Sequence, residues 1–222
     1  MGEKASLGIA DNYETGTKTF ERSKTLLELV EQFGSSEVNA AINGGYFAAS
    51  GGPFGKVPGL ADGSITGLAY TNGKDYSGPM EQEFATIIWT GTEFKIESLK
   101  SAYDPGVGGW MLSGADPHAL VVGGKIQSGW TINAGNEERS IIGYTSDNAP
   151  IIVSTTDNSK LTYAQAAQIM QNLGAEGAIM LDGGNSTSFY EKTNGMIEES
   201  PFFRPIPNFI VISDKPKIKG NR

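Results

Sequence analysis

The chain has 222 residues, a net charge of −8 at pH 7, 30 glycines, one histidine and no cysteine. This length allows one large domain with a substantial core, and the negative charge argues against broad electrostatic binding of nucleic acid or an anionic membrane. The missing cysteines and the single histidine exclude disulfides, cysteine nucleophiles and multi-histidine metal sites, so carboxylates, hydroxyls and the four arginines must carry any chemistry.

The amino-terminal residues 1–24 are polar and rich in turn formers, with room for at most one short strand. No basic stretch followed by an apolar core opens the sequence, and no apolar run approaches the roughly 20 residues that span a bilayer. The protein as written is therefore expected to be soluble and either cytoplasmic or phage-associated, or secreted if a signal peptide has been removed.

Two segments, residues 25–33 and 163–173, carry the helical pattern. Each begins after a threonine, Thr25 or Thr162, that has a Glu or Gln three residues later, and each is followed by a glycine. The apolar positions recur every three or four residues, which predicts one buried face on each helix. These positions are Leu26, Leu27, Val30 and Phe33 in the first helix and Ala166, Ile169, Met170 and Leu173 in the second.

The other apolar runs are short and end in glycine-rich turns, which is typical of strands and hairpins. Strands are predicted at residues 38–42, 141–145, 151–155, 178–181 and 209–212, with hairpin turns at 72–73, 91 and 123–124. The order strand, helix, strand from residue 151 to residue 181 predicts a right-handed crossover that brings two strands together in one sheet. Residues 48–67 and 103–118 are predicted to be long loops, and the first could be a lid.

These patterns predict an α+β fold: a single domain with a mixed, curved β-sheet, two main helices packed on it and additional hairpins. The domain is expected to span residues 1–222. Its core is expected at about residues 25–213, with peripheral ends at 1–24 and 214–222.

Four polar segments lie beside predicted core strands, so that the fold can bring them to one edge. They are NGGYF at 43–47, ERSIIG at 138–143, LDGGNSTSF at 181–189 and FRPIPN at 203–208. Paired glycines can present backbone N–H groups to an anion, and Arg139 and Arg204 suit a phosphate because the guanidinium fork matches its oxygens. Asp182 can serve as a base, hold a metal or orient a neighbour; alternatively, Asp-Gly-Gly is a simple turn in which Asp182 caps its own backbone.

In this order and spacing, the four segments resemble the phosphodiester glycosidase family over residues 38–212, with Asn185 where the family has a third glycine. The resemblance implies a hydrolase that releases a sugar, such as N-acetylglucosamine, from a sugar-1-phosphodiester. The expected partner is thus a small-molecule or glycan phosphodiester, and not nucleic acid or a membrane. No metal ion or other cofactor is expected, and the sequence indicates no particular oligomeric state.

The resemblance also implies roles for individual residues. Asp182 is the candidate base that orients water at the anomeric carbon, and Arg139 and Arg204 are the candidate phosphate ligands. Glu138 is a second candidate carboxylate, although the alternation of side chains along a strand points it away from the ligand of Arg139. Asn43 is expected to bind substrate oxygens or to orient Asp182. The remaining candidates for substrate binding are Gly44, Gly45, Gly183, Gly184, Ser186 and Thr187.

Two other functions stay open at this point. The same residues could bind a phosphorylated glycan or a nucleotide without hydrolysis, or the protein could be a structural component of a phage tail or cell-wall complex, with the motifs serving as turns. His118 lies in no recognisable motif and is expected to be a structural histidine.

Overall fold

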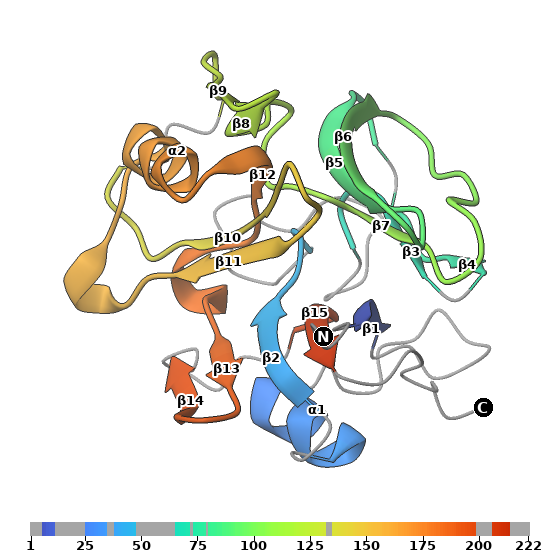
Figure 1. Cartoon of the computed structure of the whole chain (residues 1–222), viewed down its shortest axis with the longest axis vertical. Coiled ribbons are helices and arrows are strands. Elements are labelled where there is room, and N and C mark those ends of the chain that lie inside the picture. The colour runs from blue at the N-terminus through green and yellow to red at the C-terminus, as the bar shows by residue number, and fades with distance from the viewer. Residues whose placement is uncertain are drawn as a thin grey trace.

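The computed structural model describes residues 6–11, 25–34, 38–47, 65–71, 73–78, 80–131, 135–198 and 206–213. These residues form three five-stranded sheets, two α-helices and two short 3-10 helices. Figure 1 shows one sheet on the left, a second on the right, and a third below and between them. Every strand pair recorded for these residues is antiparallel.

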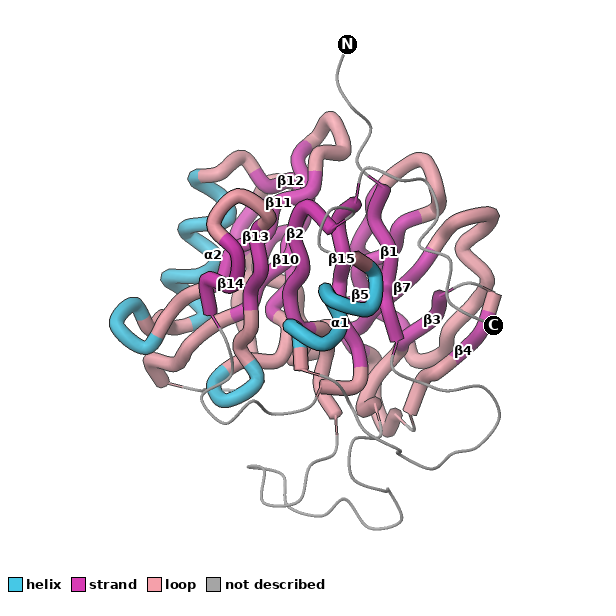
Figure 2. The backbone as a smooth tube through the Cα atoms, turned by 90° about the horizontal axis from the view of Figure 1, so that it is seen from below, coloured by secondary structure: helices cyan, strands magenta, loops and turns pink. Residues whose placement is uncertain are grey.

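The first sheet, at the bottom of Figure 1, joins the two ends of the described chain. Its strands, in spatial order, are β1 (Ser6–Asp11), β15 (Asn208–Ser213), β2 (Val38–Asn43), β13 (Phe189–Glu191) and β14 (Gly195–Glu198). The predicted strands at residues 38–42 and 209–212 are thus confirmed, and they pair with each other. Helix α1 (Leu26–Phe33) lies across this sheet (Figure 2).

The second sheet contains the predicted crossover. Its strands, in spatial order, are β11 (Pro150–Ser154), β10 (Ser140–Thr145), β12 (Ala175–Met180), β8 (Val121–Val122) and β9 (Lys125–Ile126). Helix α2 (Tyr163–Asn172) connects β11 to β12, but β10 lies between these two strands and pairs with both. The prediction that these two strands belong to one sheet is therefore correct.

The third sheet includes a strand that the sequence did not reveal. Its strands, in spatial order, are β4 (Lys74–Asp75), β3 (Ala69–Thr71), β7 (Trp110–Ser113), β5 (Phe84–Trp89) and β6 (Phe94–Leu99). Strand β7 lies within residues 103–118, which were predicted to be a loop. All four of its residues are buried between β3 and β5, so the cross-strand packing of Trp110 and its neighbours outweighs the glycines on either side.

Both predicted helices are present, and each has the expected capping box at Thr25 or Thr162. Their buried faces differ in part from the prediction, and Leu173 is the residue that caps the carboxyl end of α2. Leu27 and Leu173 are 44% and 52% exposed. The buried positions are Leu26, Leu29 and Val30 in α1 and Tyr163, Ala166, Ala167 and Met170 in α2.

The fold is therefore α+β, with three antiparallel sheets in place of one mixed sheet. The predicted lid falls mostly on residues 48–64, which lie outside the described ranges, as do most of residues 1–24 and all of 214–222. No helix within the described ranges combines the length and the hydrophobicity that crossing a membrane requires.

Candidate active site

The loop that follows β12 lies directly against the segment that leads into β10. Leu181 N donates to Ser140 O at 2.8 Å, and Gly184 N donates to Glu138 O at 2.9 Å. Gly183 fits between the two segments because it has no side chain: a Cβ there would lie 2.7 Å from Glu138 O. The fold thus brings Asp182 and Arg139, which are 43 positions apart in the sequence, to adjacent backbone positions.

The backbone of Asp182 is held on both sides by the segment that follows β2. Its N–H donates to Gly44 O at 3.0 Å, and its carbonyl accepts from Asn43 Nδ2 at 2.7 Å. Its carboxylate Oδ1 accepts from Gly183 N at 3.0 Å, which is the self-capping contact considered for a simple turn. The side chain is 7% exposed, so that the carboxylate is positioned firmly and largely shielded from water.

Asn43 is the centre of this arrangement. Its Oδ1 accepts from Ser140 Oγ at 2.5 Å and from Ser188 N at 3.1 Å, while its Nδ2 donates to Asp182. All three partners belong to different segments, and Asn43 is completely buried. Of the two roles expected for Asn43, these contacts favour orienting Asp182.

Arg139 is almost completely buried, with 4% of its surface exposed. Its Nε donates to Leu161 O at 2.9 Å and its Nη2 to Gly135 O at 2.8 Å. Burial lowers the pKa of the guanidinium, but arginine remains charged in proteins. Because these two partners are carbonyls, they orient the guanidinium without neutralising its charge. The guanidinium carbon also lies 5.0 Å from the centre of the Tyr163 ring, in a cation–π contact.

Two tyrosines and a second aspartate share the electrostatic environment of Asp182 and Arg139. Burial raises the pKa of Tyr46 most, the charges of Asp182 and Asp116 raise it further, and Arg139 lowers it. The pKa of Tyr163 is raised first by burial and then by Tyr46 and Asp116. Both phenols therefore remain protonated at neutral pH, where they can donate hydrogen bonds.

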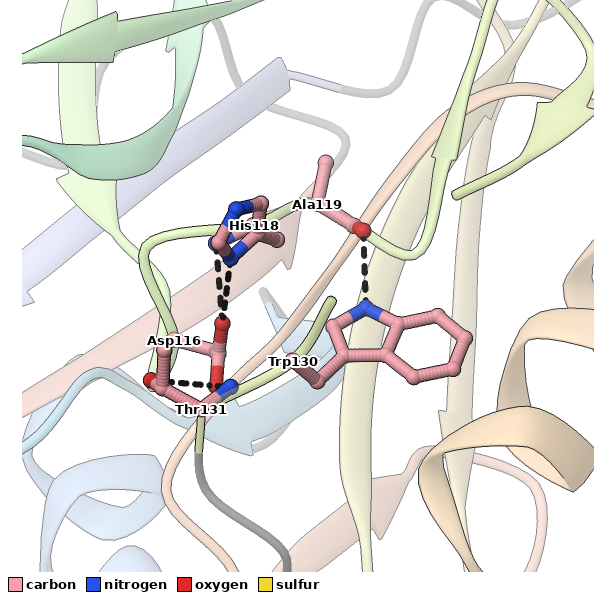
Figure 3. A network of polar contacts seen from close by, with 5 residues as sticks. All are labelled: Asp116, His118, Ala119, Trp130 and Thr131. Atoms are coloured by element: carbon pink, nitrogen blue, oxygen red, sulfur yellow. Dashed lines mark hydrogen bonds and ion pairs between the residues drawn. The ribbon is translucent and has the colours of Figure 1, made fainter. Parts of the chain in front are cut away.

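Asp116 is held by its own network, which Figure 3 shows. Its Oδ1 accepts from His118 N at 2.9 Å and contacts His118 Nδ1 at 3.3 Å, while its Oδ2 accepts from Thr131 N at 2.8 Å and Thr131 Oγ1 at 3.1 Å. Ala115 N donates to Met180 O, which places this segment beside the end of β12. The ring of His118 is half-exposed and helps to hold the buried Asp116.

Sequence reasoning missed Tyr46, Tyr163 and Asp116. Tyr46 lies within the NGGYF segment, so its motif was a usable signal. Tyr163 opens α2 and Asp116 follows β7, and no sequence pattern connects either residue with Asp182.

The predicted glycine amides are mostly engaged within the protein. Gly44 N donates to Asn208 O at 2.9 Å, and the amides of Gly184 and Gly183 bind Glu138 and Asp182. These contacts tie the loops together instead of presenting N–H groups to an anion. Of the four glycines, only Gly45 has an amide for which the described residues supply no recorded hydrogen-bond acceptor.

The other predicted residues occupy different places. The carboxyl group of Glu138 lies by Asp157 and Lys160, where it influences the pKa of both. Ser186 and Thr187 are buried in and beside the short helix η2 (Gly184–Ser186). Arg204 lies outside the described residues. Within the described ranges, no three His, Asp or Glu side chains are arranged to hold a metal ion.

Comparison with known proteins connects this site to a family. The family model for phosphodiester glycosidase matches residues 36–213, whereas a search of curated proteins found no match. One similar solved structure is the catalytic domain of zebrafish N-acetylglucosamine-1-phosphodiester alpha-N-acetylglucosaminidase, auto-inhibited by its pro-peptide. Its TM-score is 0.66 at 16% sequence identity, and the match covers 95% of this chain and 73% of that chain.

Two further structures share the fold at low identity. A putative exported protein from Burkholderia pseudomallei has a TM-score of 0.64 at 11% identity, covering 94% of this chain and 71% of that one. A hypothetical protein from Synechocystis has a TM-score of 0.59 at 14% identity, covering 94% and 56%. Because the family model spans most of the chain, the protein belongs to the phosphodiester glycosidase family and is a hydrolase of that type.

Proposed function

We propose that the protein hydrolyses a sugar-1-phosphodiester at the anomeric carbon, with Asp182 orienting the attacking water and Arg139 stabilising the departing phosphate. The observation that supports this proposal most is the close pairing of the two segments that carry these residues. Backbone hydrogen bonds hold Asp182 and Arg139 at adjacent backbone positions, and both residues are shielded from water. A carboxylate and a cation on either side of a sugar phosphate are the groups that this reaction needs.

The phosphate is already a good leaving group, so neutralising its growing charge matters more than protonating it. Arg139 can do this effectively because charge interactions are stronger in a buried site than in water. Asp182 is rigid, since Asn43 and Gly44 hold its backbone. Rigid placement of the base relative to the phosphate lowers the entropic cost of bringing water and sugar together.

The proposed substrate is a glycan phosphodiester, as the family implies, and N-acetylglucosamine is the first sugar to test because the zebrafish relative carries it in its name. Arg204 remains the proposed second arginine on its motif alone. Glu138 contributes through its backbone carbonyl, which holds Gly184, while its carboxyl group lies by Asp157 and Lys160.

The test is the release of sugar from N-acetylglucosamine-1-phosphodiesters in ¹⁸O-labelled water, followed by mass spectrometry. Attack at the anomeric carbon puts the label in the sugar, whereas attack at phosphorus puts it in the phosphate. Asp182→Asn should lower kcat by roughly 10²–10⁴-fold. Arg139→Lys keeps a charge but not both carbonyl contacts, and it should lower kcat/KM by roughly 10²-fold.

Arg139→Lys is preferable to Arg139→Ala because loss of the whole side chain would remove one of the two donors to Leu161 O and the donor to Gly135 O and would destabilise the fold. Sugar release at the wild-type rate by both variants would refute the proposal. Tight binding of the phosphodiester by the wild type, without product after long incubation, would instead identify a non-catalytic binder.

A further inference from the structure

The hydroxyl of Tyr163 is unusual among the buried groups around Arg139. Tyr163 is 4% exposed, and its hydroxyl has no hydrogen-bond partner among the described residues. Buried polar groups in folded proteins are nearly always paired, because an unpaired one has lost its hydration without compensation. An unpaired hydroxyl that persists beside a functional site is therefore a candidate for ligand binding.

The ring that carries this hydroxyl is fixed in place from two directions. The guanidinium of Arg139 lies 5.0 Å from the ring centre, and the ring of Trp130 lies 5.9 Å away at an angle of 47°. Arg139 itself is held by Leu161 O, two positions before Tyr163. The hydroxyl and the guanidinium therefore keep a constant relative placement, as two groups that bind one ligand must.

Three features at this point attract an anion. Arg139 carries a positive charge, α2 begins at Tyr163 so that the positive end of the helix dipole lies here, and the phenol is a hydrogen-bond donor. Burial raises the pKa of this phenol most, and the charges of Asp116 and Asp182 raise it further, so that the phenol stays protonated. A protonated phenol beside a guanidinium matches the oxygens of a phosphoryl group, which only accept hydrogen bonds.

We propose that the Tyr163 hydroxyl donates a hydrogen bond to a phosphoryl oxygen of the substrate, next to Arg139. This inference rests on the proposed function, because it assigns the phosphate end of the same site. It adds a substrate-binding residue that lies outside all four sequence motifs. It also explains why α2 begins with a tyrosine whose hydroxyl finds no partner within the described protein.

Tyr163→Phe tests the proposal cleanly, since it removes one oxygen and leaves the ring, its contact with Trp130 and its stacking on Arg139 in place. Without ligand, the variant should unfold at the same or a higher temperature than the wild type, because an unpaired buried hydroxyl is gone. With inorganic phosphate, the rise in Tm seen for the wild type should shrink in the variant. KM for the phosphodiester should rise and kcat should fall, which together lower kcat/KM by roughly ten-fold or more, because the lost hydrogen bond holds the bound phosphate and also stabilises the charge that grows on it as it leaves.

Tyr144→Phe is the matched control. Tyr144 is also a partly buried tyrosine, stacked on Phe94 with the ring centres 5.4 Å apart, but its hydrogen-bonding partner is the backbone at Ile96. It lies near the far end of β10 from Arg139. This variant should change neither kcat/KM nor the response to phosphate.

The two proposals fail in different ways. Wild-type protein that releases sugar while Tyr163→Phe keeps an unchanged kcat/KM and an unchanged response to phosphate overturns the role of Tyr163 and leaves the hydrolase assignment standing. A wild type that releases no sugar but loses phosphate stabilisation on Tyr163→Phe overturns the proposed reaction and supports the anion contact. A wild type that phosphate does not stabilise, with kcat/KM unchanged in the variant, also overturns the role of Tyr163.

Discussion

Replacing Asn43 by alanine should strongly destabilise the protein. The substitution removes the partners of Asp182 O, Ser140 Oγ and Ser188 N, which are held at 2.7, 2.5 and 3.1 Å. Leaving one buried group unpaired costs about 1–3 kcal/mol. Allowing for some relaxation, we expect Asn43→Ala to lower the free energy of unfolding by roughly 3–6 kcal/mol.

Such a loss is on the order of 10–20 °C in Tm for a chain of this length, well within the reach of calorimetry or urea titration. Asn194→Ala is the control, because its amide binds Glu191 on an exposed turn. That substitution should change stability by no more than about 0.5 kcal/mol.

The same substitution should also lower the activity. Since Asn43 positions the backbone of Asp182, a folded Asn43→Ala protein should lose kcat at temperatures well below its Tm. A loss of activity with stability unchanged to within about 1 kcal/mol would refute this account. Asn43 would then contact the substrate directly.

Two further predictions concern the packing and the ionisation of the site. Gly183→Ala should lower both Tm and kcat/KM, because the new Cβ would lie 2.7 Å from Glu138 O and would force the Asp182 loop away from Arg139. Gly135→Ala is the control: its new Cβ meets nothing within 4 Å, so Tm and kcat/KM should change little. Tyr46 and Tyr163 have pKa values raised above the ordinary 10.0, so the stability that they contribute is present below pH 10 and is lost as pH rises from there toward their folded pKa values. Thermal unfolding measured from pH 8 to pH 11 should therefore show that the wild type loses more stability than a variant in which both tyrosines are replaced by phenylalanine. Equal losses in the two proteins would contradict the raised pKa values of Tyr46 and Tyr163.

Several features of the fold could be predicted from the sequence because they depend on neighbouring residues. The capping boxes at Thr25 and Thr162 and the glycine turns at Gly91 and Gly123 satisfy local backbone groups within a few positions. Each therefore depends on a short pattern that can be read from the sequence. The family resemblance was also readable from the sequence, and the family model matches residues 36–213.

The sequence alone thus determined the two helices, most of the hairpins and strands, and the family. Only the tertiary structure showed that β7 lies in the centre of a sheet and that β10 lies between β11 and β12. Only the tertiary structure also showed that the glycine amides bind other loops of the protein, and that Tyr163 and Asp116 lie at the site. These outcomes depend on contacts between residues far apart in the chain, whose free energy comes from burial and from pairing buried polar groups. No local pattern records which distant partner a side chain will meet.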